Sequence, residues 1–153
     1  MVRIAVNGAM GRMGSRILAL AQASPKDFQI AGTFEQDTKG QRLSAASLKG
    51  KGVLIDFSGP AGTSAALAHA QKAGWGLVVG TTGLEPAMQE AIRAASKKIP
   101  IVYSANMSVG VNLIAKLVAL AAASLGKDFD IEITEAHHRH KKDAPSGTAL
   151  LLA

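Results

Sequence analysis

Short runs of branched apolar residues recur along the chain and end at glycine, serine or asparagine. Runs of this kind predict buried strands. We expect strands at Val2–Val6, Phe28–Phe34, Val53–Phe57, Trp75–Val79, Ile101–Tyr103 and Asp130–His137.

Stretches with helical spacing separate these runs. The first follows Gly8 and ends near Ser24-Pro25, and later helices are expected at Ala61–Ala73, Glu85–Lys98 and Val109–Leu125. The polar, Gly- and Ser-rich stretch 37–52 predicts a loop with at most a short helix. Because strands alternate with helices, the pattern predicts an α/β fold, a Rossmann-type doubly wound parallel sheet. The last strand would begin a second, α+β domain.

A glycine-rich turn joins the first expected strand to the first helix. Gly8, Gly11 and Gly14 are spaced G-x-x-G-x-x-G, a variant of the common dinucleotide fingerprint. Gly8 permits a tight turn, Gly11 allows a pyrophosphate to approach, and Gly14 allows close packing. Glu35 ends the second strand, where an acid holds a ribose hydroxyl. An ordinary flexible turn is the alternative.

The residue after this acid bears on the choice of cofactor. A cation there pairs with the 2′-phosphate of NADP, whereas this chain has the neutral Gln36. Arg12, on the first helix, could supply the charge instead. The residues favour NAD slightly and leave NADP open.

Three further loops follow strands at the edge where open parallel sheets bind ligands. They are "DFSGP" (56–60), "GTTG" (80–83) and "SANMSVGVN" (104–112). Small and polar residues suit contact with a ribose and a nicotinamide amide. They also dominate ordinary turns, so only the three together favour a site.

The run "HHRHKK" (137–142) contains three of the 17 Lys and Arg residues of a chain with net charge +6. His137 and His140 have H-x-x-H spacing, but the chain has no cysteine and the adjacent cations would repel a metal ion, so we expect no metal. The basic runs carry no aromatic residues, so we expect no nucleic acid partner. A solvated basic loop is the remaining alternative.

Targeting signals are not evident in the sequence. The start lacks the pattern of a secretory signal, and no apolar stretch approaches the ~20 residues that span a bilayer. We therefore expect a cytoplasmic protein with no membrane partner.

Five motifs, "GAMGRMG", "DFS", "GTTG", "SANMSVGVN" and "EAHHRHKKDAPSGTA", occur in this order. With them the chain resembles the 4-hydroxy-tetrahydrodipicolinate (dihydrodipicolinate) reductase family of lysine biosynthesis. The resemblance implies a dinucleotide-binding domain at 1–107 and the start of a substrate-binding domain at 108–153. It implies reduction of a cyclic, imine-derived dicarboxylate by NADH or NADPH, in a homotetramer.

The resemblance also implies roles for single residues. It makes His137 and Lys141 the catalytic pair and places His138, Ser146, Gly147 and Thr148 on the substrate. The cofactor residues that it implies are Gly8, Ala9, Met10, Gly11, Arg12, Met13, Glu35, Gly80, Thr81, Thr82, Ser104, Ala105, Asn106 and Met107.

These roles fit elementary chemistry. Hydride delivery to a conjugated imine requires a proton donor, and Lys141 or His137 could be that donor.

Members of the family continue beyond the position of Ala153, so we expect a truncated chain. Two alternatives therefore stay open: a non-catalytic nucleotide-binding fragment of the enzyme, and another NAD(P)-dependent imine or dicarboxylate reductase.

Overall fold

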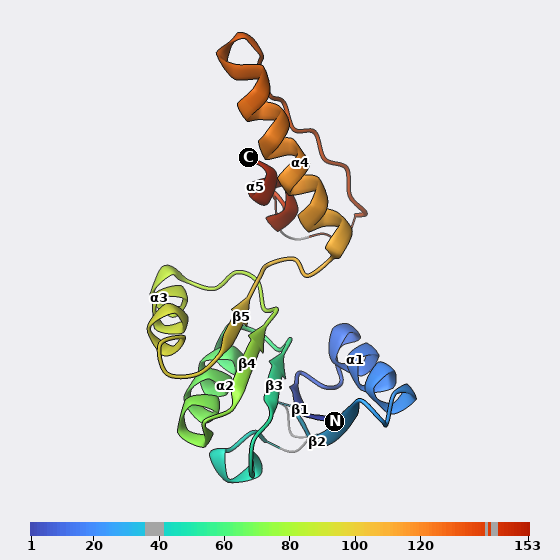
Figure 1. Ribbon diagram of the computed structural model, residues 1–153, viewed down its shortest axis with the longest axis vertical. Coiled ribbons are helices and arrows are strands. Elements are labelled where there is room, and N and C mark those ends of the chain that lie inside the picture. Colours follow the sequence, from blue (N-terminus) through green and yellow to red (C-terminus); the bar gives the residue numbers. More distant parts are fainter. Residues whose placement is uncertain (36–41, 140, 142–143) are drawn as a thin grey trace. The chain divides into compact units, whose positions relative to one another are not determined.

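The chain forms two compact units, Met1–Ser104 and Ala105–Ala153, in a computed structural model (Figure 1). The structure describes residues 1–35, 42–139, 141 and 144–153. The expectations placed on Gln36 and His140 lie outside the described residues.

The first unit is built on a parallel sheet. Its strands run in the order β2-β1-β3-β4-β5, and every neighbouring pair is parallel. The chain therefore builds outward from β1 in both directions, and the reversal lies between β1 and β3. The prediction of a doubly wound sheet is confirmed. The strands are β1 Val2–Asn7, β2 Phe28–Phe34, β3 Val53–Asp56, β4 Gly76–Val79 and β5 Ile101–Tyr103.

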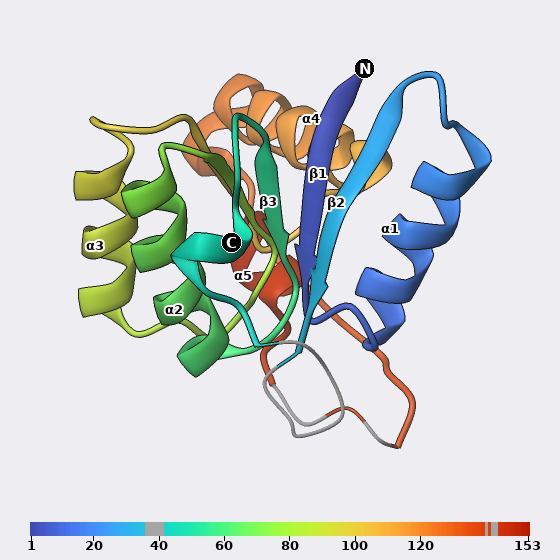
Figure 2. The same ribbon diagram turned by 90° about the horizontal axis from the view of Figure 1, so that it is seen from below.

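Helices cover both faces of this sheet. Helix α1 (Arg12–Ala23) lies on one side, and α2 (Pro60–Ala73) and α3 (Pro86–Ala95) lie on the other (Figure 2). Right-handed crossovers require this arrangement, because the chain moves one way from β1 and the other way from β3. Each expected helix is present within a few residues of its predicted bounds. The described part of the predicted loop, residues 42–52, contains the short helix η1 (Ala45–Ser47).

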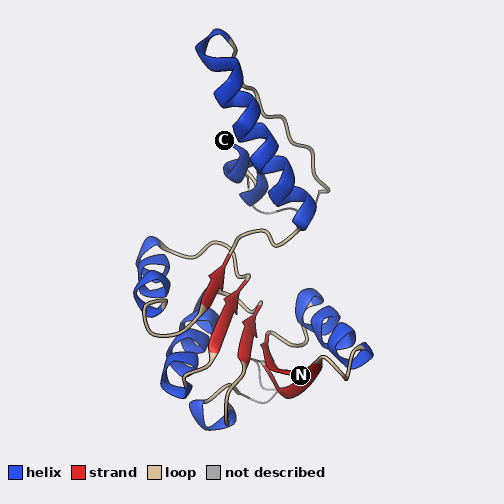
Figure 3. Cartoon of the chain, viewed as in Figure 1, coloured by secondary structure: helices blue, strands red, loops and turns tan. Residues whose placement is uncertain are grey.

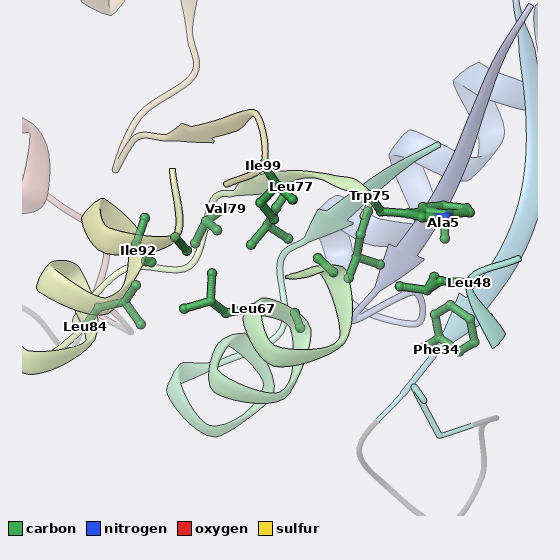
Figure 4. Close-up of a cluster of buried hydrophobic side chains, with 14 residues drawn as sticks. Ala5, Phe34, Leu48, Leu67, Trp75, Leu77, Val79, Leu84, Ile92 and Ile99 are labelled. Atoms are coloured by element: carbon green, nitrogen blue, oxygen red, sulfur yellow. The ribbon is translucent and has the colours of Figure 1, made fainter. Parts of the chain in front are cut away.

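A core of branched and aromatic side chains joins the sheet to α2 and α3 (Figure 4). Trp75, the sole tryptophan, is fully buried, and its Nε1–H donates to the Gly50 carbonyl at 2.7 Å. Leu54, Leu77 and Val79 alternate inward from the central strands. This packing holds the carboxyl ends of the strands in register, where the site residues follow.

The second unit consists of α4 (Val109–Leu125), the short helix η2 (Gly126–Asp128) and α5 (Gly147–Leu152) (Figure 3). Helix α4 has its predicted bounds. The predicted strand Asp130–His137 is wrong, because this segment belongs to no sheet. Alternating residues make a strand only when a second strand supplies hydrogen bonds, and the described part of this unit contains none.

The expectation that no apolar stretch reaches membrane length is also wrong. Among the described residues, one helical stretch, Val109–Asp128, is long and apolar enough to cross a membrane, with mean hydropathy 1.8. Asn112, Lys116 and Ser124 interrupt it, which hides its length in a reading of unbroken runs. None of it is buried within the unit, so its leucines lie exposed.

Candidate functional site at the carboxyl edge of the sheet and in the histidine loop

The turn between β1 and α1 requires glycine at two of its three glycine positions. Gly8 has φ +78°, and a Cβ there would lie 2.6 Å from the Phe57 carbonyl oxygen. A Cβ on Gly14 would overlap the Gly8 carbonyl oxygen and lie 2.8 Å from the Ala9 Cα. Glycine at both positions therefore lets the first turn of α1 pack directly on the strand-to-helix turn.

The start of α1 presents backbone amides. Gly11 is the N-cap residue and offers no side chain to the helix, so the amides of Arg12, Met13 and Gly14 have no partner in the helix's own pattern. These amides and the helix dipole favour an anion. Ala9 is buried, whereas the side chains of Met10, Arg12 and Met13 are exposed around the turn.

A cavity of about 290 Å³ lies beside the end of β2 and includes the predicted ribose acid. Its lining residues are Asn7, Glu35, Arg42, Leu43, Gly62 and Ala65. Arg42 was missed from the sequence, although it stands in the basic loop "KGQRLSAASLKGKG". The cavity therefore places the cation of Arg42 near Glu35. From the sequence, the position of Gln36 and the side chain of Arg12 were the two places considered for such a charge.

Asp56 ends β3 and is fully buried. The sequence placed it in the loop "DFSGP" but gave it no role of its own. Its Oδ1 accepts from Asn7 Nδ2 at 2.8 Å and from Ser58 Oγ at 2.6 Å. Its Oδ2 accepts from Thr63 Oγ1 at 2.5 Å and from Thr81 Oγ1 at 3.1 Å. One carboxylate thus joins the ends of β1 and β3, helix α2 and the loop after β4. The signal was an acid directly after an apolar strand.

The loop after β4 is fixed against its neighbour. Thr81 is buried and bonded to Asp56, and a Cβ on Gly80 would overlap the Phe57 ring. Thr82 is exposed at the edge. Ser104 follows β5 and donates its amide to the Val79 carbonyl at 3.2 Å. The structure therefore brings the predicted residues Gly80, Thr81 and Ser104 to the same edge as Gly8.

The predicted residues Ala105, Asn106 and Met107 belong to the second unit. Within it, Asn106 Nδ2 donates to Thr148 Oγ1 at 3.2 Å, and Asn106 Oδ1 accepts from the Ser108 amide at 2.9 Å. Asn112, which was not predicted, donates to the carbonyls of Asn106 and Ser108. A predicted cofactor residue and a predicted substrate residue are thus hydrogen-bonded to each other.

Glu135 makes two side-chain contacts in the histidine loop, the segment 135–146 that contains the run "HHRHKK". Its Oε2 lies 2.8 Å from His137 Nε2, and its Oε1 accepts from the Ser146 amide at 2.9 Å. Hydrogen bonds from the His137 ring, and then from the Ser146 hydroxyl and amide, lower the pKa of Glu135 from 4.5 to about 2. Ser146 Oγ accepts from the Ala149 amide at 3.1 Å and so caps α5. Both polar groups of Ser146 are therefore engaged.

A turn after His137 brings the backbone of Lys141 next to that of His138. The Lys141 amide donates to the His138 carbonyl at 3.1 Å, and the Lys141 side chain is half-buried. The structure thus draws His137, His138, Lys141, Ser146, Gly147 and Thr148 into one unit of 49 residues, Ala105–Ala153. Across the described ranges, no group of three His, Cys, Asp or Glu could hold a metal ion.

Comparison with known proteins decides the family. The model described as dihydrodipicolinate reductase, N-terminus, matches residues 2–107, and the model for the C-terminus of the same enzyme matches residues 110–153. The chain belongs to the dihydrodipicolinate reductase family. The resemblance seen in the sequence motifs is confirmed.

Two curated relatives in this family are named 4-hydroxy-tetrahydrodipicolinate reductase. The protein from Nitrosomonas europaea is 43% identical over 166 residues, covering 97% of this chain and 62% of the relative. The protein from Zymomonas mobilis is 48% identical over 160 residues, covering 99% and 60%. The chain thus spans about three fifths of the length of these relatives.

A solved structure gives the same family. It is a dipicolinate-bound dihydrodipicolinate reductase from Paenisporosarcina sp. TG-14, with a TM-score of 0.77 and 26% identity. The match covers all of this chain and 66% of the solved one.

Proposed function

We propose that this chain acts in the reduction of 4-hydroxy-tetrahydrodipicolinate to tetrahydrodipicolinate, on the diaminopimelate route to lysine, with NADH or NADPH. The observation that carries the proposal is that both segments of the reductase family match in order, with 43 and 48% identity to named reductases. A cytoplasmic location and a homotetramer of the full-length enzyme belong to the same proposal.

The residues at the sheet edge fit a dinucleotide. The turn has no room for side chains at positions 8 and 14, which are both glycine. The first amides of α1 can receive a pyrophosphate. Glu35 lines a cavity where a ribose hydroxyl could be bound. We propose residues 1–107 as the dinucleotide-binding domain, with 108–153 beginning the substrate domain, and the boundary between the two family models supports this division.

When bound, the reduced nicotinamide supplies a hydride. The 4-hydroxyl group of the substrate must leave as water, which gives the conjugated imine. A ring carbon of that imine would then accept the hydride, and the nitrogen or its tautomer must take one proton. We assign the proton to Lys141 and His137, which lie in the same loop. The cations of this loop and the amides that begin α5 would bind the substrate's carboxylates.

A non-catalytic, nucleotide-binding fragment is the second candidate. The specific observation in its favour is that the chain spans about three fifths of its relatives, while the apolar side chains of α4 lie exposed.

Two measurements separate these candidates. Calorimetric titration with NADH and NADPH tests the dinucleotide site, and a turnover assay with enzymatically generated substrate tests the reaction. Binding with turnover supports the reductase, and Lys141→Ala should then lower kcat chiefly. Binding without turnover supports the fragment, and the absence of binding refutes both.

A further inference from the structure

The Glu135 carboxylate accepts on both of its oxygens, toward two residues with proposed roles on the substrate. His137 Nε2 lies 2.8 Å from one oxygen, and the Ser146 amide donates to the other at 2.9 Å. The Glu135 side chain is 27% exposed and that of His137 is 38% exposed. Glu135 therefore joins the extended segment after η2 to the start of α5.

An ionised carboxylate only accepts hydrogen bonds, so its contact with the ring decides where the His137 proton lies. A neutral imidazole carries one N–H, and a ring facing Glu135 through Nε2 carries it there. The second nitrogen, Nδ1, is then the one directed away from the carboxylate. Carboxylate partners fix the tautomer and orientation of catalytic histidines in this way.

We infer that Glu135 is a positioning residue, which sets the protonated nitrogen of His137 and holds the Ser146 turn at the start of α5. The inference rests on the proposed function, in which His137 and the start of α5 act on the substrate. Glu135 itself transfers no proton and makes its contribution through these two neighbours.

Glu135→Gln tests this role with little change of shape. A glutamine has one oxygen and one NH2 group, so it cannot accept from both neighbours. If its oxygen faces the Ser146 amide, its NH2 faces His137 Nε2 and drives the ring to the Nδ1–H tautomer. If its oxygen faces the ring, the Ser146 amide loses its acceptor. Glu132→Gln is the matched control, because Glu132 is exposed on the same segment.

The direct readout is nuclear magnetic resonance of the 153-residue chain labelled with 15N, with His137 assigned by His137→Gln. At alkaline pH, where the spectrum shows a neutral ring, the wild-type His137 should be the Nε2–H tautomer. Glu135→Gln should either change that tautomer or speed hydrogen exchange at the Ser146 amide, whereas Glu132→Gln should do neither. If Glu135→Gln leaves both signals unchanged, the inference is overturned.

Kinetics supply the second readout. Glu135→Gln should lower kcat by about tenfold to a hundredfold, the effect of misplacing a reacting group, with little change in KM for NADH. An unchanged kcat in Glu135→Gln would overturn the positioning role. If the wild-type chain binds NADH but does not turn over, the proposed activity fails instead, and the tautomer and amide signals still decide the role of Glu135.

Discussion

Thr63→Val removes one hydrogen bond to the buried Asp56 carboxylate and leaves the shape of the side chain almost unchanged. Thr63 is fully buried on α2, and its hydroxyl donates to Asp56 Oδ2 at 2.5 Å. The carboxylate keeps three other donors, from Asn7, Ser58 and Thr81. The substitution therefore isolates one bond within the group that joins the strand ends.

The magnitude follows from the charge on the acceptor. A hydrogen bond to a charged group contributes about 1.5–3 kcal/mol, and a buried methyl in place of the hydroxyl returns about 0.8 kcal/mol. We expect Thr63→Val to lower the free energy of unfolding by about 1–2 kcal/mol.

Urea denaturation followed by Trp75 fluorescence measures this loss, because the sole tryptophan is buried in the same unit. The midpoint should fall while the slope stays unchanged. Thr33→Val is the matched control, since Thr33 is exposed on β2 and valine suits a strand equally well. In an Asp56→Asn background the loss from Thr63→Val should shrink by about 1 kcal/mol, because the two residues are coupled. The reasoning would be refuted if Thr63→Val lowered the free energy of unfolding no more than Thr33→Val does. It would also be refuted if Thr63→Val lowered that free energy equally in the Asp56→Asn background and in the wild type.

Three further predictions concern the site. Gly14→Ala should destabilise the chain by about 1–3 kcal/mol through overpacking and abolish NADH binding in calorimetry. Gly76→Ala is the control and should keep NADH binding, because a methyl there makes ordinary contacts of 3.6 Å. Tight NADH binding by both variants would contradict the packing argument. Arg42→Ala should weaken NADPH binding about tenfold, through loss of one charge-assisted hydrogen bond to the 2′-phosphate, and should leave NADH binding unchanged. Lys26→Ala is the control. Equal losses of affinity for both cofactors would show that Arg42 does not recognise the 2′-phosphate. Glu135 has its folded pKa lowered from 4.5 to about 2, so its stabilising contribution is present above pH 4.5 and is lost as the pH falls toward 2. A 13C titration of the carboxyl carbon measures that pKa, and a midpoint near 4.5 would show that the bonds to His137 and Ser146 do not form.

Local patterns were sufficient for most elements of this chain. β2 (Phe28–Phe34) and α4 (Val109–Leu125) have the bounds that periodicity predicted. The period of two and the period near 3.6 arise from backbone geometry alone, so they are visible in any sufficiently regular segment. The prediction of a strand at Asp130–His137 was wrong. The residues there alternate as in a strand, but a strand also requires a hydrogen-bonded neighbour.

The same distinction applies to the site. The glycine turn and the histidine loop stand in the sequence as continuous motifs, and their residue types indicated dinucleotide and dicarboxylate chemistry. Arg42 carries no such local sign, and Asp56 shows only an acid directly after an apolar strand, because the fold sets the partners of both residues. Asp56 bonds to Asn7, 49 positions earlier, and Arg42 shares a cavity with Glu35 and Gly62.

The sequence by itself determined the order of the elements in the first unit, the doubly wound sheet and the family to which the chain belongs. Each of these rests on residues that are adjacent or regularly spaced along the chain. Only the tertiary structure decided which polar groups meet: the four donors on Asp56, the cation beside Glu35, and the Glu135 carboxylate between His137 and Ser146. Hydrogen bonds depend on distances of about 3 Å, and folding sets those distances between residues that the sequence keeps apart.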